Sequence, residues 1–118
     1  MLVLSEDQRM LQDAARGFVQ EKSPVAALRK LRDERVADGF DRALWRDMAQ
    51  MGWTGILVPE EAGGLGFGFV GAGLICEEMG RTLAASPFLS TAVMAATALS
   101  RAGTKAQKDR WLQAIVDR

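Results

Sequence analysis

Histidine is absent from this sequence, and cysteine occurs only once. Without histidine, the chain cannot form a histidine-ligated metal site, a Ser–His or Cys–His nucleophile pair, or an imidazole acid–base catalyst. The lone Cys76 cannot form an internal disulfide, which favours a reducing compartment, and its apolar neighbours indicate a core residue. We therefore predict no metal site in this sequence.

An excess of charge of one sign and a long apolar run are also missing. Fifteen Lys and Arg balance fifteen Asp and Glu, which argues against nucleic acid or an anionic membrane as the main partner. No apolar run approaches the roughly 20 residues that span a bilayer. The opening MLVLSEDQ carries acids by position 6, unlike a signal or transit peptide. We therefore expect a cytoplasmic or matrix-type protein that binds neither nucleic acid nor membrane.

Helix-start signals are the clearest patterns present. Ser5 with Gln8, and Thr104 with Gln107, form two capping boxes that predict the starts of the first and last helices. Apolar residues at helical spacing follow these and other start signals. The expected buried sides are Leu11, Ala14, Ala15 and Phe18; Val25, Leu28 and Leu31; Leu44, Trp45, Met48 and Met51; Val70, Leu74, Ile75 and Met79; and Trp111, Leu112, Ile115 and Val116.

Further signals divide the first half of the chain. Ser23 is expected to cap a second helix, with Pro24 at its first position, and Gly39 to break that helix. Asp41 is expected to cap a third helix that Gly52 ends.

The second half of the chain is expected to contain three more helices. A strand-like run over residues 54–58 stops at Pro59; a fourth helix begins near Phe69 and a fifth covers residues 88–101. We predict an all-α fold over residues 1–118: one compact domain of about six helices, an up-and-down or orthogonal bundle, with one long glycine-rich loop.

The glycine-rich loop contains Gly66-Phe67-Gly68-Phe69-Val70-Gly71, which matches the G-x-G-x-x-G pattern of dinucleotide-binding turns. Its context argues against that function. Residues 59–62 separate the strand-like run from the glycines, and no acid occurs between Glu78 and Asp109 to bind a ribose. We expect a backbone role instead, through positive φ or close chain approach, for Gly63, Gly64, Gly66 and Gly68.

A family resemblance is carried by three stretches in this order: LWRDMAQMGWTGILVPEEAGGLGFGF, EEMGRTLAASPFLST and AGTKAQKDRWLQAI. Together they resemble the N-terminal helical domain of the acyl-CoA dehydrogenases. The family pattern combines a tryptophan-containing helix, Gly-Trp, a V-P-E-E/Y-G-G-x-G loop, a Glu-Glu-Leu/Met-Gly helix and a last helix with Gln-Lys. Because the order and spacing cover nearly all of the chain, the match is specific.

The resemblance implies an oxidoreductase of fatty acid metabolism. Family members remove a proton from Cα of an acyl-CoA with a glutamate base and pass a hydride from Cβ to N5 of FAD. Their longer chains add a middle β-domain and a C-terminal helical domain, which hold the FAD and the base. This sequence ends about where the family chain enters the β-domain. We therefore expect no catalytic and no FAD-binding residue here, with FAD held only by the complete enzyme.

Two hypotheses of different class follow. In the first, the chain is the N-terminal domain of a flavin-dependent acyl-CoA dehydrogenase, not catalytic alone, whose partners are the acyl-CoA and the remaining domains or subunit. In the second, it is a free-standing helical interaction module derived from that domain. Four acids match loop and helix positions of the family rather than its base, and we expect structural roles for them. They are Glu60, Glu61, Glu77 and Glu78.

Substrate contacts are expected at the turn between the fourth and fifth helices, which lines the acyl channel in the family. The matching positions are Ser86, Pro87, Phe88, Ser90 and Thr91. The alternative, that Pro87 only starts a helix and Phe88 only fills the core, stays open. The uncharged run over residues 88–100 predicts an apolar helix with one side exposed, and hence a homo-oligomer.

Overall fold

The computed structural model describes residues 3–117, which form helices and turns and no strand. The predicted all-α fold is confirmed. Six α-helices are present, with two 3-10 turns and one π-helical segment between them. Their bounds are α1 (Glu6–Lys22), α2 (Val25–Asp33), α3 (Arg42–Gln50), η1 (Trp53–Gly55), η2 (Glu60–Ala62), α4 (Phe69–Thr82), η3 (Phe88–Ala95), α5 (Ala96–Ala102) and α6 (Lys105–Val116).

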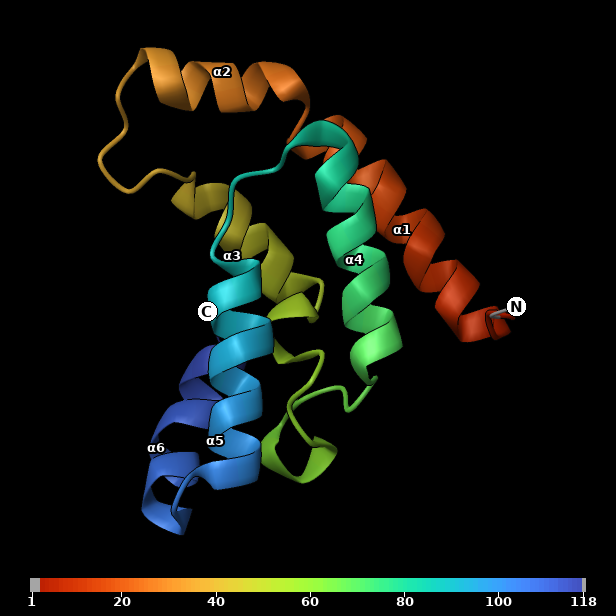
Figure 1. Ribbon diagram of the computed structural model, residues 1–118, viewed down its shortest axis with the longest axis vertical. Helices are drawn as coiled ribbons and strands as arrows, with labels where there is room; N and C mark the ends of the chain where they lie inside the picture. Colours follow the sequence, from red (N-terminus) through yellow and green to blue (C-terminus); the bar gives the residue numbers. More distant parts are fainter. Residues whose placement is uncertain (1–2, 118) are drawn as a thin grey trace.

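The helices pack as two groups (Figure 1). Helices α1 and α4 lie side by side, while η3 and α5 form one continuous rod that packs on α6. The η1 turn joins the groups because it contacts α3, η3 and α6. The hydroxyl of Thr54 in η1 donates to the carbonyl of Val116 in α6 at 3.0 Å, which fixes the last helix against the centre.

The main core lies between α1, α3, α4, η1 and η3. Its largest fully buried side chains include Trp53, whose ring packs at a tilt of 58° against that of Phe18, with the ring centroids 4.7 Å apart. The remaining members are Ala15, Val19, Leu44, Met48, Ile56, Ala72, Ile75, Phe88 and Ala92. A smaller cluster of Val58, Ala96 and Leu112 lies beneath α6. Four residues expected on buried sides are exposed: Ala14, Met51, Val70 and Trp111.

Most predicted helix ends are confirmed. Both capping boxes form, with Ser5 and Thr104 accepting from the backbone N–H of the expected glutamines. Asp41 caps α3 by accepting from the Ala43 N–H at 2.8 Å. Gly52 follows α3 with φ 84°, a left-handed conformation that glycine adopts without strain.

The predicted Ser23 cap is wrong. Ser23 ends α1 instead, because its N–H donates to the carbonyl of Val19, and Pro24 precedes α2 in an extended conformation. Helix α2 buries no residue completely, and its apolar side, including Leu28 and Leu31, is only half-buried. A cavity of about 380 Å³ lies between that side and the segment leading to α3. Figure 1 shows α2 lying across one end of the molecule.

The strand-like run over residues 54–58 forms no strand; it begins in η1 and continues as a turn. Its backbone makes i→i+3 hydrogen bonds, such as Ile56 N–H to the Trp53 carbonyl at 3.2 Å and Val58 N–H to Gly55 at 3.1 Å. The apolar side chains of the run are buried in the two clusters. The run is therefore a buried turn whose apolar composition serves the core.

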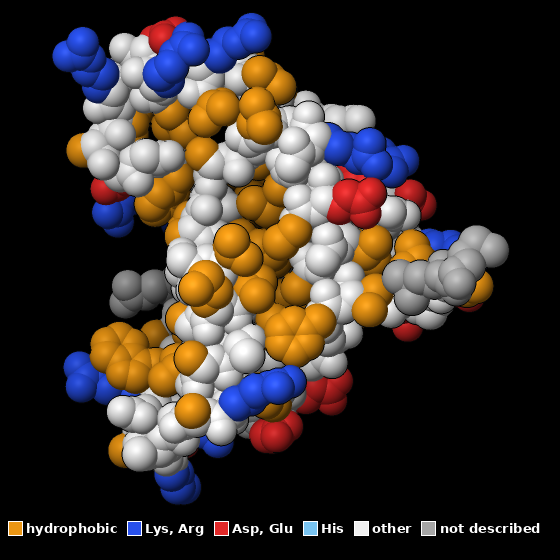
Figure 2. All heavy atoms as spheres, viewed as in Figure 1, with side chains coloured by type: hydrophobic (Ala, Val, Ile, Leu, Met, Phe, Trp, Pro, Cys, Tyr) orange, Lys and Arg blue, Asp and Glu red, His pale blue; other side chains and the backbone are white. Residues whose placement is uncertain are grey.

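The fifth helix runs from Phe88 to Ala102, and its first half is π-helical. Several large hydrophobic side chains stay exposed along it and at the start of α4. Figure 2 shows hydrophobic side chains gathered over the middle of the side of the molecule that is seen in Figure 1, with charged side chains mostly around its edges. The exposed residues include Leu89 and Met94 on η3, and Phe69 on α4.

Candidate functional site at the turn before η3

The five predicted substrate-contact residues lie together at the turn that joins α4 to η3. Pro87 precedes the helix, and its carbonyl accepts from the Thr91 N–H at 2.9 Å and from the Ser90 hydroxyl at 3.2 Å. The Ser86 hydroxyl accepts from the Phe88 N–H at 3.3 Å. These contacts cap the first turn of η3, so two of the three hydroxyls already have a local structural role.

The five residues do not all face the same way. Ser90 is exposed, and Ser86, Pro87 and Thr91 are half-buried, so these four can contact a molecule from outside the domain. Phe88 is completely buried in the main core. Its role as a core residue is therefore established. A contact of any of the five with substrate stays a prediction.

Two exposed apolar residues beside the turn were not predicted. Leu89 is 59% exposed and Met94 is 63% exposed, and both belong to η3. The sequence signal that could have found them is their five-residue spacing within the uncharged run, since residues five apart share a face in a π-helix.

The glycine loop has the backbone role that the sequence predicts. Gly63, Gly66 and Gly68 have φ of 90°, 55° and 92°. Gly64 instead permits close approach, because a Cβ atom there would overlap the carbonyl oxygen of Val58. The loop folds back on the buried turn, and the Leu65 N–H donates to the Gly55 carbonyl at 2.9 Å.

The same loop does not fit a dinucleotide or flavin pyrophosphate. A Cβ on Gly71 would overlap the ring of Phe67, so this glycine makes room for a side chain of the chain itself. Gly66 lies beside the side chain of Glu60, an acid that would repel a phosphate. Within residues 3–117 no strand precedes the loop. The glycines are therefore used for packing.

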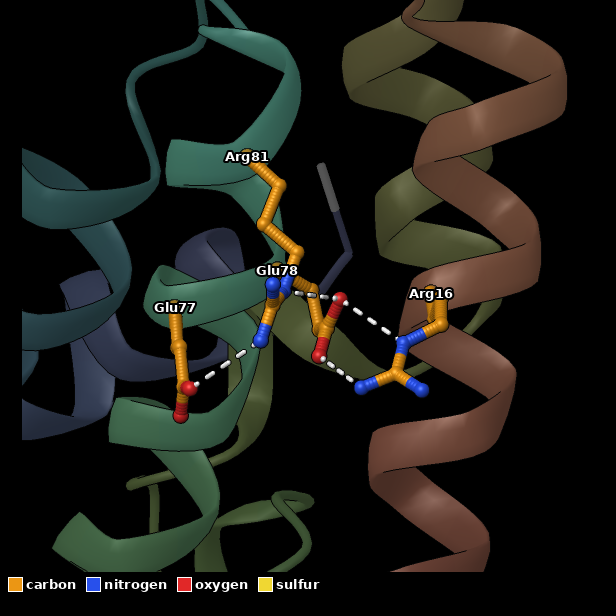
Figure 3. Close-up of polar contacts among 4 residues, drawn as sticks. All are labelled: Arg16, Glu77, Glu78 and Arg81. Atoms are coloured by element: carbon orange, nitrogen blue, oxygen red, sulfur yellow. Dashed lines mark hydrogen bonds and ion pairs between the residues drawn. The ribbon is translucent and has the colours of Figure 1, made fainter.

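A buried carboxylate joins α1 to α4 (Figure 3). Glu78 is completely buried, and its two oxygens accept from Arg16 Nε at 3.3 Å and Nη2 at 3.0 Å. Arg81 Nε lies 3.2 Å from Glu78 Oε2, and Arg81 also contacts Glu77 at 3.4 Å. Hydrogen bonds from Arg16 are the main cause of a lowered pKa of Glu78; burial opposes the shift, and the charges of Arg16 and Arg81 add to it. The predicted structural role is confirmed for Glu78.

We expect Glu78→Gln to destabilise the fold by about 1–2 kcal/mol, because an amide replaces a carboxylate in charge-assisted hydrogen bonds. The loss is limited since Arg16 and Arg81 are 45% and 54% exposed and regain water. Because the folded-state pKa is lowered, the carboxylate stabilises the protein above the unfolded pKa of about 4.3, and this contribution disappears as pH falls through the folded value. Urea unfolding from pH 7 to pH 3 measures both effects.

The wild-type minus Glu78→Gln difference in unfolding free energy should shrink as the pH falls. Glu77→Gln is the matched control, since Glu77 is exposed and contacts only Arg81 across its helix at 3.4 Å. An equal loss in both variants would contradict the assignment of the α1–α4 link to Glu78.

Cys76 has the surroundings of a structural thiol. It is half-buried against the main core, and burial raises the pKa of its thiol, which disfavours the reactive thiolate. Within residues 3–117, no group of three or more acidic or cysteine side chains is arranged to bind a metal ion. No helix among the same residues is both long enough and apolar enough to cross a membrane.

Comparison with known proteins identifies the family of this chain. The family described as "Acyl-CoA dehydrogenase, N-terminal domain" matches residues 5–118. The chain belongs to the acyl-CoA dehydrogenase family. It is 33% identical over 104 residues to Acyl-CoA dehydrogenase IpdE2 of Mycobacterium tuberculosis, covering 86% of this chain and 32% of that protein.

Solved structures of the family contain the same fold. A variant of the Tcur3481-Tcur3483 steroid ACAD superposes with a TM-score of 0.84 at 35% identity, covering 95% of this chain and 30% of that one. The ChsE4-ChsE5 complex from Mycobacterium tuberculosis gives a TM-score of 0.85 at 30% identity, covering 98% and 32%. The chain thus spans about a third of the length of these acyl-CoA dehydrogenases.

Proposed function

We propose that this chain acts as the N-terminal domain of a flavin-dependent acyl-CoA dehydrogenase, which removes hydrogen from Cα and Cβ of an acyl-CoA thioester. The observation that carries the proposal is the family match over residues 5–118, together with the shared fold at TM-scores of 0.84 and 0.85. The family supplies the activity in this proposal, and the flavin site is assigned to the parts of the enzyme that this chain does not match.

The domain's own contribution would be the wall of the acyl channel and packing against further domains or subunits. Ser86, Pro87, Ser90 and Thr91 would form the wall, because they lie on one turn and face out of the domain. Phe88 would support that wall from the core side. The hydroxyls of Ser86 and Ser90 already hydrogen bond to the backbone, so they offer few polar contacts to a ligand. Such a wall suits an acyl chain better than a polar ligand.

Partners of the domain are part of the proposal. The glutamate base and the FAD site would come from the remaining dehydrogenase domains, on the same or another chain. Assembly into a multi-subunit enzyme is supported by the ChsE4-ChsE5 complex among the related structures. We place the enzyme in the cytoplasm and in fatty acid metabolism, by analogy with the family and from the lone unpaired cysteine.

The test mixes the purified chain with FAD, separates free flavin by gel filtration and records the visible spectrum. We expect a colourless protein peak, because the proposal assigns the flavin site to the remaining dehydrogenase domains. A yellow peak would contradict the proposed division of roles among domains.

A second arm replaces the matching N-terminal segment of Acyl-CoA dehydrogenase IpdE2 with residues 5–118. We expect the chimera to fold and to retain the flavin content of its parent. A folded chimera that has lost its flavin would show that this chain does not supply the domain's packing role. The interaction-module hypothesis predicts that second result.

A further inference from the structure

Helix α2 is held to the rest of the domain more weakly than α3 is. Both helices have nine residues, but α3 buries Leu44 and Met48, whereas α2 buries no residue. The closely packed pairs of elements within residues 3–117 include α3 with η1 and do not include α2. In Figure 1, α2 lies across one end of the molecule, and a long loop joins it to α3. Segments with few buried apolar contacts are the ones that open most easily in a folded protein.

The hydrogen bonds of α2 and the loop after it are local. Within residues 3–117, the backbone hydrogen bonds of residues 24–40 have both partners inside that stretch. The Asp38 carboxylate forms an ion pair with Arg42 Nε at 2.6 Å, and Arg42 is the first residue of α3. Movement of residues 24–37 away from the domain would therefore break no backbone hydrogen bond to another element.

Both ends of this stretch are anchored to α3. Lys22, at the end of α1, forms an ion pair with Asp47 of α3 at 2.9 Å. At the other end, Asp41 caps α3 through its side chain. Gly39 lies just before this second anchor with φ 72°, and a Cβ atom there would meet nothing within 4 Å. Because nothing packs on Gly39, its backbone can change conformation without a clash, as a hinge requires.

The cavity of about 380 Å³ beneath α2 explains why this helix is not packed tightly. Its apolar wall comes from the inner side of α2, from the segment leading into α3 and from the turn after α4. The residues concerned include Leu28, Leu31, Phe40, Leu44 and Ala85. Side chains that line an empty space lose the dispersion contacts that hold close-packed helices together. Ala85 directly precedes the candidate substrate turn, so the cavity reaches that turn.

We propose that α2 is a hinged lid: residues 24–40 open as a unit while the rest of the domain stays folded, and this opening uncovers Leu44 and the cavity wall at Ala85. The lid thus controls access, from one end of the domain, to the space beside the candidate substrate turn. A nine-residue helix is too short to stay folded once it leaves the domain, so its amide hydrogens exchange with solvent while the lid is open. Opening needs neither flavin nor acyl-CoA. A failure here would therefore leave the proposed dehydrogenase role untouched, and the reverse also holds.

Hydrogen exchange of the whole chain, followed by mass spectrometry, tests the lid with α3 as a control helix of equal length in the same sample. After correction for intrinsic rates, we expect the amides of α2 to exchange at least about a hundredfold faster than those of α3. Low concentrations of urea should hardly change the α2 rate, because a local opening exposes little surface, but should speed the exchange of α3. Equal exchange of both helices, with the same dependence on urea, would overturn the proposal.

Two alanine-to-glycine variants show whether the lid opens independently of α3. Ala49 lies inside α3, and glycine has a lower helix propensity, so Ala49→Gly should speed the exchange of α3 about fivefold. The exchange of α2 should stay within about twofold of wild type, because α3 is folded both before and after the lid opens. Ala26→Gly is the matched variant within α2 and should speed the exchange of α2 about threefold. If Ala49→Gly sped up both helices equally, α2 would open only together with the whole domain, and the lid would be ruled out.

Discussion

Gly64→Ala is expected to lower the free energy of unfolding by about 3 kcal/mol, a large overpacking effect for one added methyl group. The new Cβ would overlap the carbonyl oxygen and Cβ of Val58, both of which are held in place. Val58 is completely buried, and its carbonyl accepts from the Gly66 N–H at 2.9 Å. Backbone must therefore move, and the loop must separate from the buried turn. Urea unfolding followed by circular dichroism measures the loss.

Gly73→Ala is the matched control for that measurement. Gly73 is exposed within α4, and an added Cβ meets no atom within 4 Å. Alanine should therefore stabilise the helix by up to about 1 kcal/mol through its higher helix propensity. If Gly64→Ala unfolded at the same urea concentration as wild type, the loop would not pack on Val58 as described.

Phe88→Ala is expected to cost about 3–5 kcal/mol, the range for removing a buried aromatic side chain from a core. Phe88 has no exposed surface and packs among residues of the main core cluster. Its neighbour Leu89 is 59% exposed, so Leu89→Ala should change stability by no more than about 0.5 kcal/mol. Thermal and urea unfolding of the two variants would compare adjacent positions on opposite sides of one helix.

The Phe88 result bears directly on the acyl channel. If Phe88→Ala unfolds the domain, any loss of enzyme activity in that variant reports stability and not substrate contact. Ser90 and Thr91 are the better positions for testing chain-length selectivity, because neither is completely buried. A Phe88→Ala variant as stable as wild type would place the ring outside the core.

Local sequence signals were sufficient to predict a helix start where a single capping residue determines it. Ser5, Asp41 and Thr104 cap their helices through contacts two or three residues away, so a short window of sequence contains the whole cause. Ser23 carries the same chemistry but lost that role because its backbone N–H ends α1. Only Ser23 and Pro24 separate α1 from α2, so Ser23 can either end the first helix or cap the second, and local sequence signals do not decide between these roles.

Tertiary contacts decided what local signals could not. The apolar run over residues 54–58 suits a strand or a buried turn, and the choice depends on the loop, where the Leu65 N–H donates to the Gly55 carbonyl. For the candidate substrate site, the family resemblance supplied the five positions of the turn before η3. Only the folded chain shows that Phe88 points inward while Leu89 and Met94 point out.

Because α1 packs on α4, it cannot complete its packing until α4 has been synthesised. Arg16 and Glu78 are 62 residues apart in sequence, and the same separation divides Thr54 from Val116. Helix α1 leaves the ribosome before α4, so the α4 surface that packs on it is made later. A translating ribosome adds about 5–20 residues per second, so α1 waits for seconds with its apolar side uncovered. During that interval the apolar side of this helix is open to binding by a chaperone.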